Sequence, residues 1–181
     1  PLSTEGSLKY VIFGAASTAV MVYGMSLVYG ATGTLQLGGI AAAAAEQVSP
    51  MFALGLLAMF TGIAFKLAAV PMHFWCPDVF QGAPTDVTTF LSVASKGAAA
   101  CLLLRIMQVF GATQFGPGAT GFVGMALAVG ALGAVTCTWG NLVALHQTNM
   151  KRMLAYSSIA HAGYLIMAVS LLPLGATPAE Q

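Results

Sequence analysis

Two lysines stand inside long apolar segments, where a charged side chain is unfavourable. Lys66 lies in Gly-Ile-Ala-Phe-Lys-Leu-Ala-Ala-Val, and Lys96 lies in Ser-Val-Ala-Ser-Lys-Gly-Ala-Ala-Ala. A lysine at the centre of a bilayer costs about 2.5–3.5 kcal/mol on insertion scales. Loss of water disfavours the ammonium form, so a neighbouring charge decides whether such a lysine holds or releases its proton. The pair therefore predicts a proton relay inside a membrane.

A second interpretation is that either long side chain reaches the lipid headgroups from a helix end. It fits Lys66 better than Lys96, because Pro71 ends the first segment soon after Lys66. Lys96 is far from both ends of its own segment, so the relay interpretation is stronger there.

The composition predicts an all-α membrane protein. Hydrophobic residues make up 58% of the 181 residues and charged residues 6%, whereas a soluble domain carries about 25% charged residues. The surface must therefore face the lipid bilayer. A net charge of +1 provides no basic surface for nucleic acid, so no nucleic-acid partner is expected.

Five segments are long and apolar enough to cross a bilayer as helices, which takes about 20 residues. The connection Gly33 to Pro50 between the first two predicts a short interfacial helix. Because Pro1 stands in place of an initiator methionine, we interpret residues 1–181 as a single transmembrane domain that is a fragment of a larger bundle. We expect the spans at about 8–30, 51–70, 85–110, 120–146 and 152–173.

The link from Pro71 to Pro84 interrupts the pattern with a third proline, Pro77, between them. Each proline removes a backbone donor and disfavours helix in the residue before it, so the second span must break near Pro71. A broken helix at membrane depth lies against protein or a water-filled cavity, often at an ion site. We expect His73 to hold the broken backbone. The alternative is an ordinary interfacial loop anchored by its aromatic side chains.

Other titratable residues have two interpretations each. Lys9 and Glu5 have the i, i+4 spacing of a helical ion pair, although Lys9 could also serve the relay. His161 is either a further relay group or a hydrogen-bonded structural histidine. Asp78 and Asp86 flank the break, and both are expected to cap helices.

Metal and cofactor chemistry is not expected in this chain. The three cysteines have no CxxC spacing and the histidines no HExxH spacing, so we predict no metal site. The loop 147–152 is the only connection with adjacent basic residues, which predicts that it is cytoplasmic.

Two stretches resemble a known family. Residues 65–84, Phe-Lys-Leu-Ala-Ala-Val-Pro-Met-His-Phe-Trp-Cys-Pro-Asp-Val-Phe-Gln-Gly-Ala-Pro, resemble the broken-helix motif of the antiporter-like subunits of respiratory complex I. Residues 147–164 resemble the loop and helix that follow later in that family. The version Val-Phe-Gln-Gly-Ala-Pro is similar to subunit N of NADH–quinone oxidoreductase, since subunits L and M and Na⁺/H⁺ antiporter subunits more often have a Pro-Asp-Ala-His version.

The resemblance implies that Lys66 and Lys96 are the central proton-relay pair of an antiporter-like bundle, and that Lys9 matches a basic residue at the start of the preceding helix. It implies a multi-pass protein of the bacterial cytoplasmic membrane, whose partners are the other membrane subunits. NADH and quinone would be used by the whole complex, and this chain alone would catalyse nothing. The family's helix with the partner carboxylate, and its second broken helix, have no match here.

Two other functions remain open at this point. An Mrp-type cation/proton antiporter subunit would share the fold, and the transported ion could be Na⁺ in place of H⁺. A structural membrane scaffold is the third possibility, which the energetic cost of two buried lysines disfavours.

Overall fold

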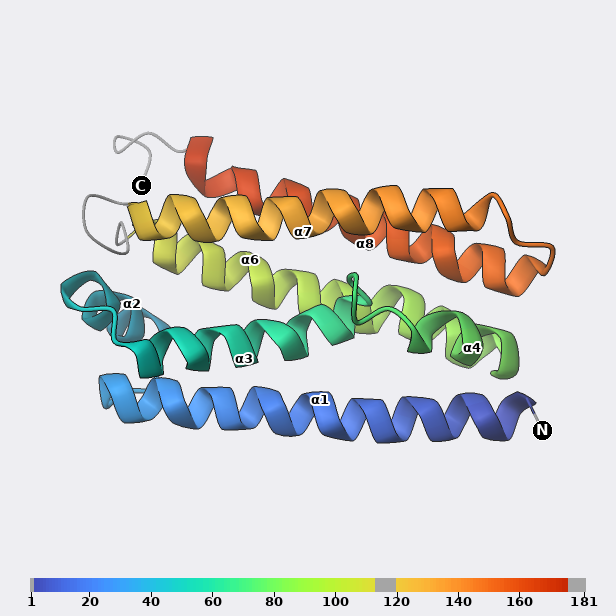
Figure 1. Cartoon of the computed structure of the whole chain (residues 1–181), viewed down its shortest axis with the longest axis horizontal. Coiled ribbons are helices and arrows are strands. Elements are labelled where there is room, and N and C mark those ends of the chain that lie inside the picture. The colour runs from blue at the N-terminus through green and yellow to red at the C-terminus, as the bar shows by residue number, and fades with distance from the viewer. Residues whose placement is uncertain (1, 113–119, 176–181) are drawn as a thin grey trace.

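The computed structural model describes residues 2–112 and 120–175. Within them the chain is a bundle of helices that lie side by side along one long axis (Figure 1). Five helical stretches are long and apolar enough to cross a membrane, which confirms the predicted fold class. The elements are α1 Leu2–Thr32, α2 Leu37–Glu46, α3 Pro50–Leu67, α4 Trp75–Gly82, α5 Thr85–Phe90, η1 Leu91–Ser95, α6 Lys96–Ala112, α7 Thr120–Ala144 and α8 Met150–Gly175.

The two ends of the bundle differ. The start of α1, the short helix α4 and the connection between α7 and α8 gather at one end (Figure 1). The short helix α2 lies at the other end, within the connection for which a short helix was predicted. The elements α5, η1 and α6 follow one another without interruption and form a single membrane-length stretch.

The helix α3 has a well-defined beginning and an abrupt end. The Ser49 hydroxyl accepts the backbone N–H of Phe52 at 3.1 Å, and Pro50 occupies the first position, where no donor is needed. The helix stops where Ala68 adopts a left-handed φ of 57°. The peptide bond before Pro71 is cis, and the chain restarts as α4. The predicted break near Pro71 is confirmed.

Glycines set how closely two pairs of helices approach. Between α1 and α3, a Cβ on Gly24 would lie 2.7 Å from the carbonyl oxygen of Gly55. Between α7 and α8, a Cβ on Gly163 would lie 2.5 Å from the backbone nitrogen of Cys137. Side chains cannot fit at such distances, so both pairs depend on small residues, as helices in membranes commonly do.

The helices α3 and α6 run in opposite directions through the core. The ring of Phe52, near the start of α3, lies 6.5 Å from the ring of Phe110, near the end of α6. Between these ends, Ile63 and Leu67 of α3 share one apolar cluster with Leu103 of α6. The helices on either side of the break therefore pack against each other in antiparallel orientation.

Candidate proton-relay site

Lys96 begins α6 directly after the π-helical turn η1. A π turn joins residues five apart and so stacks them on one side. Leu91 and Lys96 have this spacing, and they are 8% and 4% exposed. In a regular α-helix of about 3.6 residues per turn the two side chains would point in different directions. The π turn therefore lets Lys96 enter the core together with Leu91.

The ammonium group of Lys96 lies between α4 and α8. Its Nζ donates a hydrogen bond of 2.8 Å to Oγ of Ser158 on α8, and it lies 5.8 Å from the centre of the Phe80 ring on α4. The thiol of Cys76, also on α4, faces the same group. Burial raises the pKa of this thiol, so it stays neutral beside the lysine. Within residues 2–112 and 120–175, no carboxylate pairs with Lys96.

Lys66 lies in the last turn of α3, and its side chain is exposed. In the described part of the chain, the Lys66 side chain therefore does not point into the bundle. At this level α1 lies against the neighbouring Phe65, since a Cβ on Gly14 would be 3.8 Å from its ring. Ile63 and Leu67 fill the core. No described helix covers the side of α3 that carries Lys66.

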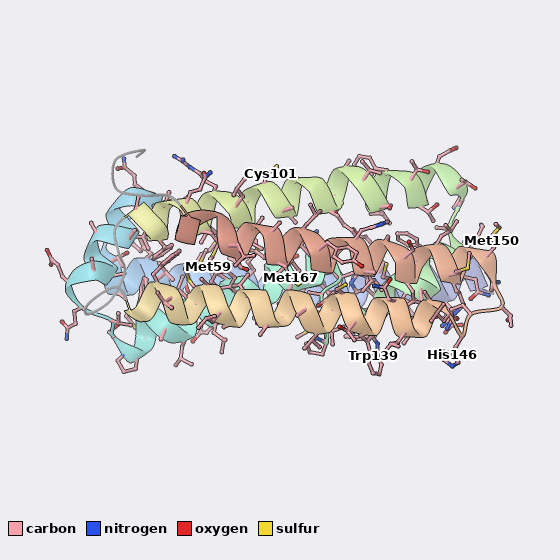
Figure 2. The ribbon with its side chains drawn as sticks, turned by 90° about the horizontal axis from the view of Figure 1, so that it is seen from above. Met59, Cys101, Trp139, His146, Met150 and Met167 are labelled. Carbon is pink, nitrogen blue, oxygen red and sulfur yellow. The ribbon has the colours of Figure 1, made fainter. Side chains whose placement is uncertain are left out.

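The helix α7 supports the broken segment after α3. The freed backbone N–H of Val70 donates to Oγ1 of Thr136 at 3.0 Å, and this hydroxyl donates to the carbonyl oxygen of Leu132 at 2.7 Å. Trp139, on the outer side of the same helix (Figure 2), donates its indole N–H to Nε2 of His73 at 3.1 Å. Burial lowers the pKa of His73, so the ring accepts this bond in its neutral form. His73 thus joins the broken segment to α7, while Thr136 satisfies the backbone.

Aromatic residues close the other side of the break. Trp75 is 3% exposed, and it donates its indole N–H to the carbonyl oxygen of Phe65 at 3.2 Å. The two rings stack with centroids 5.2 Å apart, and Phe80 is buried as well. The alternative of an interfacial loop anchored in the headgroups by Trp75 and Phe80 is therefore wrong.

Asp78 of α4 joins three helices at one end of the bundle. One carboxylate oxygen accepts from Nζ of Lys9 on α1 at 2.6 Å, and the other accepts from Nη1 of Arg152 on α8 at 2.7 Å. Lys9 also pairs with Glu5 at 2.6 Å, as its spacing predicted. Burial alone would raise the pKa of Asp78, but the hydrogen bonds from Lys9 and Arg152 hold it below its ordinary value. The prediction that Asp78 caps a helix is wrong, because these cations take both oxygens.

The remaining predicted residues lie apart from Lys96. His161 is exposed on α8, with its ring 6.3 Å from that of Tyr164. Asp86 is exposed in the first turn of α5, where no side chain caps the helix, so its predicted capping role is also wrong. Of the four residues proposed for a relay, Lys96 is the buried one. The described residues contain no group of three or more potential metal ligands.

Three residues of the site escaped the sequence analysis: Ser158, Thr136 and Arg152. They lie 62, 66 and 74 positions from the groups that they bind. A hydroxyl or a cation in an apolar helix is a signal in itself, because polar groups there join neighbouring helices. That signal identifies the residues but not their partners.

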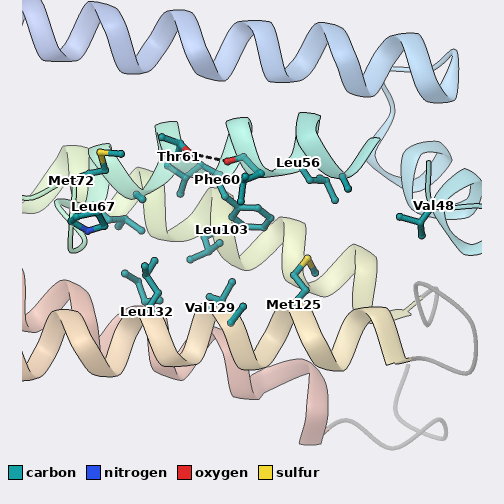
Figure 3. Close-up of a pocket in the computed structure, with 17 residues that line it drawn as sticks. Val48, Leu56, Phe60, Thr61, Leu67, Met72, Leu103, Met125, Val129 and Leu132 are labelled. Carbon is teal, nitrogen blue, oxygen red and sulfur yellow. Dashed lines mark hydrogen bonds between the residues drawn. The ribbon is translucent and has the colours of Figure 1, made fainter. Parts of the chain in front are cut away.

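A separate cavity of about 500 Å³ lies between α3, α6 and α7 (Figure 3). Its lining is apolar and includes Phe60, Leu103 and Val129. The hydroxyl of Thr61 is bound to the carbonyl oxygen of Leu57 at 2.9 Å and does not serve the cavity. Since none of the described residues that line it can titrate, the cavity does not extend a proton path from Lys96.

Residues 1–177 match the model of a transmembrane family described as "NADH:quinone oxidoreductase/Mrp antiporter, TM". The chain belongs to this family. Its curated relatives include NADH-quinone oxidoreductase subunit N of Moorella thermoacetica, 49% identical over 181 residues, which are 96% of this chain and 36% of the relative. Subunit N of Anaeromyxobacter sp. (strain Fw109-5) is 47% identical over 188 residues, 93% of this chain and 35% of the relative. The resemblance to subunit N is confirmed.

Solved structures of respiratory membrane complexes share the fold. A chain of respiratory complex I from Thermus thermophilus is 42% identical with a TM-score of 0.72, over 91% of this chain and 34% of that one. A chain of the membrane-bound sulfane sulfur reductase, an archaeal respiratory membrane complex, is 31% identical with a TM-score of 0.80, over 92% and 33%. This chain is thus a multi-pass membrane protein that spans about a third of the length of its relatives.

Proposed function

We propose that this chain is part of the proton-translocating membrane subunit N of NADH–quinone oxidoreductase and couples quinone reduction to proton pumping through Lys66 and Lys96. The observation that carries the proposal is the surroundings of Lys96, which is 4% exposed and bound to the neutral Ser158. A buried lysine without an acidic partner is costly in lipid, which is why such residues mark ion pathways. Family membership and the similarity to subunit N support the same function.

The arrangement supports a switch in the charge of Lys96. Burial disfavours the ammonium form, while the Ser158 oxygen and the face of the Phe80 ring favour it. Two opposing influences leave the lysine sensitive to a further charge nearby. A cation that approaches along the bundle drives the proton off Lys96, and its withdrawal allows a new proton to bind.

Lys66 is proposed to supply that charge. Its side chain is exposed in the described part of the chain, and an uncovered ammonium at membrane depth is unfavourable. Because this chain spans about a third of its relatives, we propose that further helices of the full-length protein cover Lys66 and provide the carboxylate that holds its charge. Lys9, on the entry side, and His161 remain candidates for further proton transfer.

The rest of the reaction is proposed to take place elsewhere in the complex. NADH and quinone react in other subunits, and this chain contributes no electron transfer of its own. Its partners are other membrane subunits and the lipid of the bacterial cytoplasmic membrane. We place the loop 147–152 on the cytoplasmic side. A cysteine at the exposed Thr148, in a protein whose exposed Cys101 is replaced by Ser, tests this by labelling from each side.

The function is tested by replacing each lysine with Ala in the full-length subunit of the assembled enzyme. Both Lys66→Ala and Lys96→Ala should lower NADH-driven proton pumping and quinone-linked NADH oxidation together. Lys66→Arg should also lower both, because arginine does not release its proton. The matched control is Arg105→Ala, which removes an exposed cation from the same helix as Lys96. Normal pumping by an assembled Lys96→Ala enzyme would contradict the proposal.

An Mrp-type cation/proton antiporter subunit is the second candidate, because the matched family includes these antiporters. It predicts that membranes exchange Na⁺ for H⁺ without NADH. The subunit N proposal predicts that proton movement needs NADH and quinone and does not need Na⁺. Measuring both activities in the same vesicles separates the two functions.

A further inference from the structure

Ser158 provides the only hydrogen bond that the described residues give to the Lys96 ammonium. The bond is 2.8 Å long and joins α6 to α8. The Ser158 hydroxyl donates its own proton to the carbonyl oxygen of Ala155 at 2.8 Å. Since a hydroxyl has one proton, the oxygen that faces Lys96 can only accept. The direction of the bond is therefore fixed from the lysine to the serine.

The other neighbours of Lys96 cannot replace Ser158. The Phe80 ring offers a cation–π contact, with no preference for one direction of the N–H bonds. Cys76 is the one titratable group that faces Lys96 among the described residues, and α3 and α8 place no other titratable group there. A thiol accepts hydrogen bonds weakly. Without Ser158, the described residues would offer the ammonium no strong acceptor.

We propose that Ser158 is a positioning residue for proton loading: it holds the Nζ of Lys96 in place and favours the protonated state. An ammonium donates a stronger hydrogen bond than a neutral amine does, so an oxygen that only accepts stabilises the protonated lysine. The inference rests on the proposed role of Lys96, and it assigns a task to a residue outside the lysine pair.

The test measures NADH-driven proton pumping against pH in the assembled enzyme with Ser158→Ala. On the alkaline side, the pH at which the pumping rate falls should be about one unit lower in Ser158→Ala than in the wild type. The reason is that a hydrogen bond to a charged group changes an equilibrium about tenfold or more. Ser158→Thr keeps the hydroxyl and should restore the profile. Ser157→Ala is the matched control, since Ser157 is the neighbouring residue on α8 and makes no hydrogen bond to Lys96.

The possible outcomes separate this inference from the proposed function. An unchanged pH profile in assembled Ser158→Ala, with Lys96→Ala inactive, would overturn the inference and leave the function in place. A loss of pumping at every pH that Ser158→Thr does not restore would show that Ser158 only packs the helices, and this too would overturn it. If Lys96→Ala itself pumps normally, the proposed function fails first. A shifted profile with rescue by Thr supports both.

Discussion

Each of the two lysines stands beside an interruption of regular helix, and the two interruptions differ in kind. Lys66 lies just before the end of α3, where Ala68 is left-handed and the chain breaks. Lys96 follows the π turn η1, where the helix continues without a break. At the first site the lysine is exposed, and at the second it is buried. A wider helical turn can bring a charged side chain into the core. At a full break, the surrounding contacts serve mainly to satisfy the freed backbone groups.

The hydrogen bonds at the two sites agree with this contrast. At the break, Thr136 and Trp75 bind backbone groups of the segment that contains Lys66, but nothing in the described residues binds Lys66 itself. At the π turn, the lysine itself is bound, because its Nζ donates to Oγ of Ser158. We infer that the break serves to hold α4 beside Lys96, and that α4 then supplies Phe80 and a neutral thiol to the site.

The largest expected effect comes from turning Lys96 out of the core. Inserting one Ala after Val93, which is 68% exposed, adds a residue between Leu91 and Lys96 and should rotate Lys96 by about 100° relative to the residues before it. Proton pumping should fall to the level of Lys96→Ala. The substitution Val93→Ala keeps the number of residues and should pump normally. If the insertion enzyme assembles and pumps like the wild type, pumping does not depend on the direction in which Lys96 points.

The contrast also explains which features the sequence can predict. Prolines predict a break in a helix, because each one removes a backbone N–H donor and disfavours helix in the residue before it. The interruption after Lys66 could therefore be predicted. The segment Leu91–Ser95 contains neither proline nor glycine, and nothing in its composition distinguishes a π turn from an α turn. The burial of Lys96 could be predicted from its energetic cost in lipid, but the turn that achieves it could not.

Contacts between residues that lie far apart in the sequence were the other feature that could not be predicted. The ion pair of Lys9 with Glu5 follows from helical spacing, whereas Asp78 reaches Arg152 across 74 positions. Local rules give a carboxylate near a helix start a capping role, and here two cations from other helices override it. The exposure of Lys66 depends on which helices cover α3, and no local pattern contains that information.

A smaller effect should follow from Thr136→Val, which tests the support of the break. The substitution keeps the shape of the side chain but leaves the partly buried N–H of Val70 without its acceptor. An unsatisfied buried donor costs about 1–3 kcal/mol, so the full-length subunit should unfold at a lower temperature, and the Val70 amide should exchange faster. Thr138→Val is the control, because that exposed hydroxyl binds only Ala134 of its own helix. Equal stability of the two variants would mean that α7 does not hold the break.

The smallest effect is expected at Asp78, and it should appear only in acid. The hydrogen bonds from Lys9 and Arg152 place the pKa of Asp78 below its ordinary value of 3.8, so the ionised form stabilises the folded state. A group with a lowered pKa contributes its stability above the ordinary pKa and loses it as the pH falls through the folded value.

The difference in thermal stability between wild type and Asp78→Asn should therefore be constant near neutral pH and shrink below about pH 4. Asp86→Asn is the control, because Asp86 is exposed and takes part in none of the ion pairs among the described residues. High salt should reduce the difference, since Asp78 and its partners are partly exposed. A difference that does not depend on pH would mean that Asp78 acts through its shape and not through its charge.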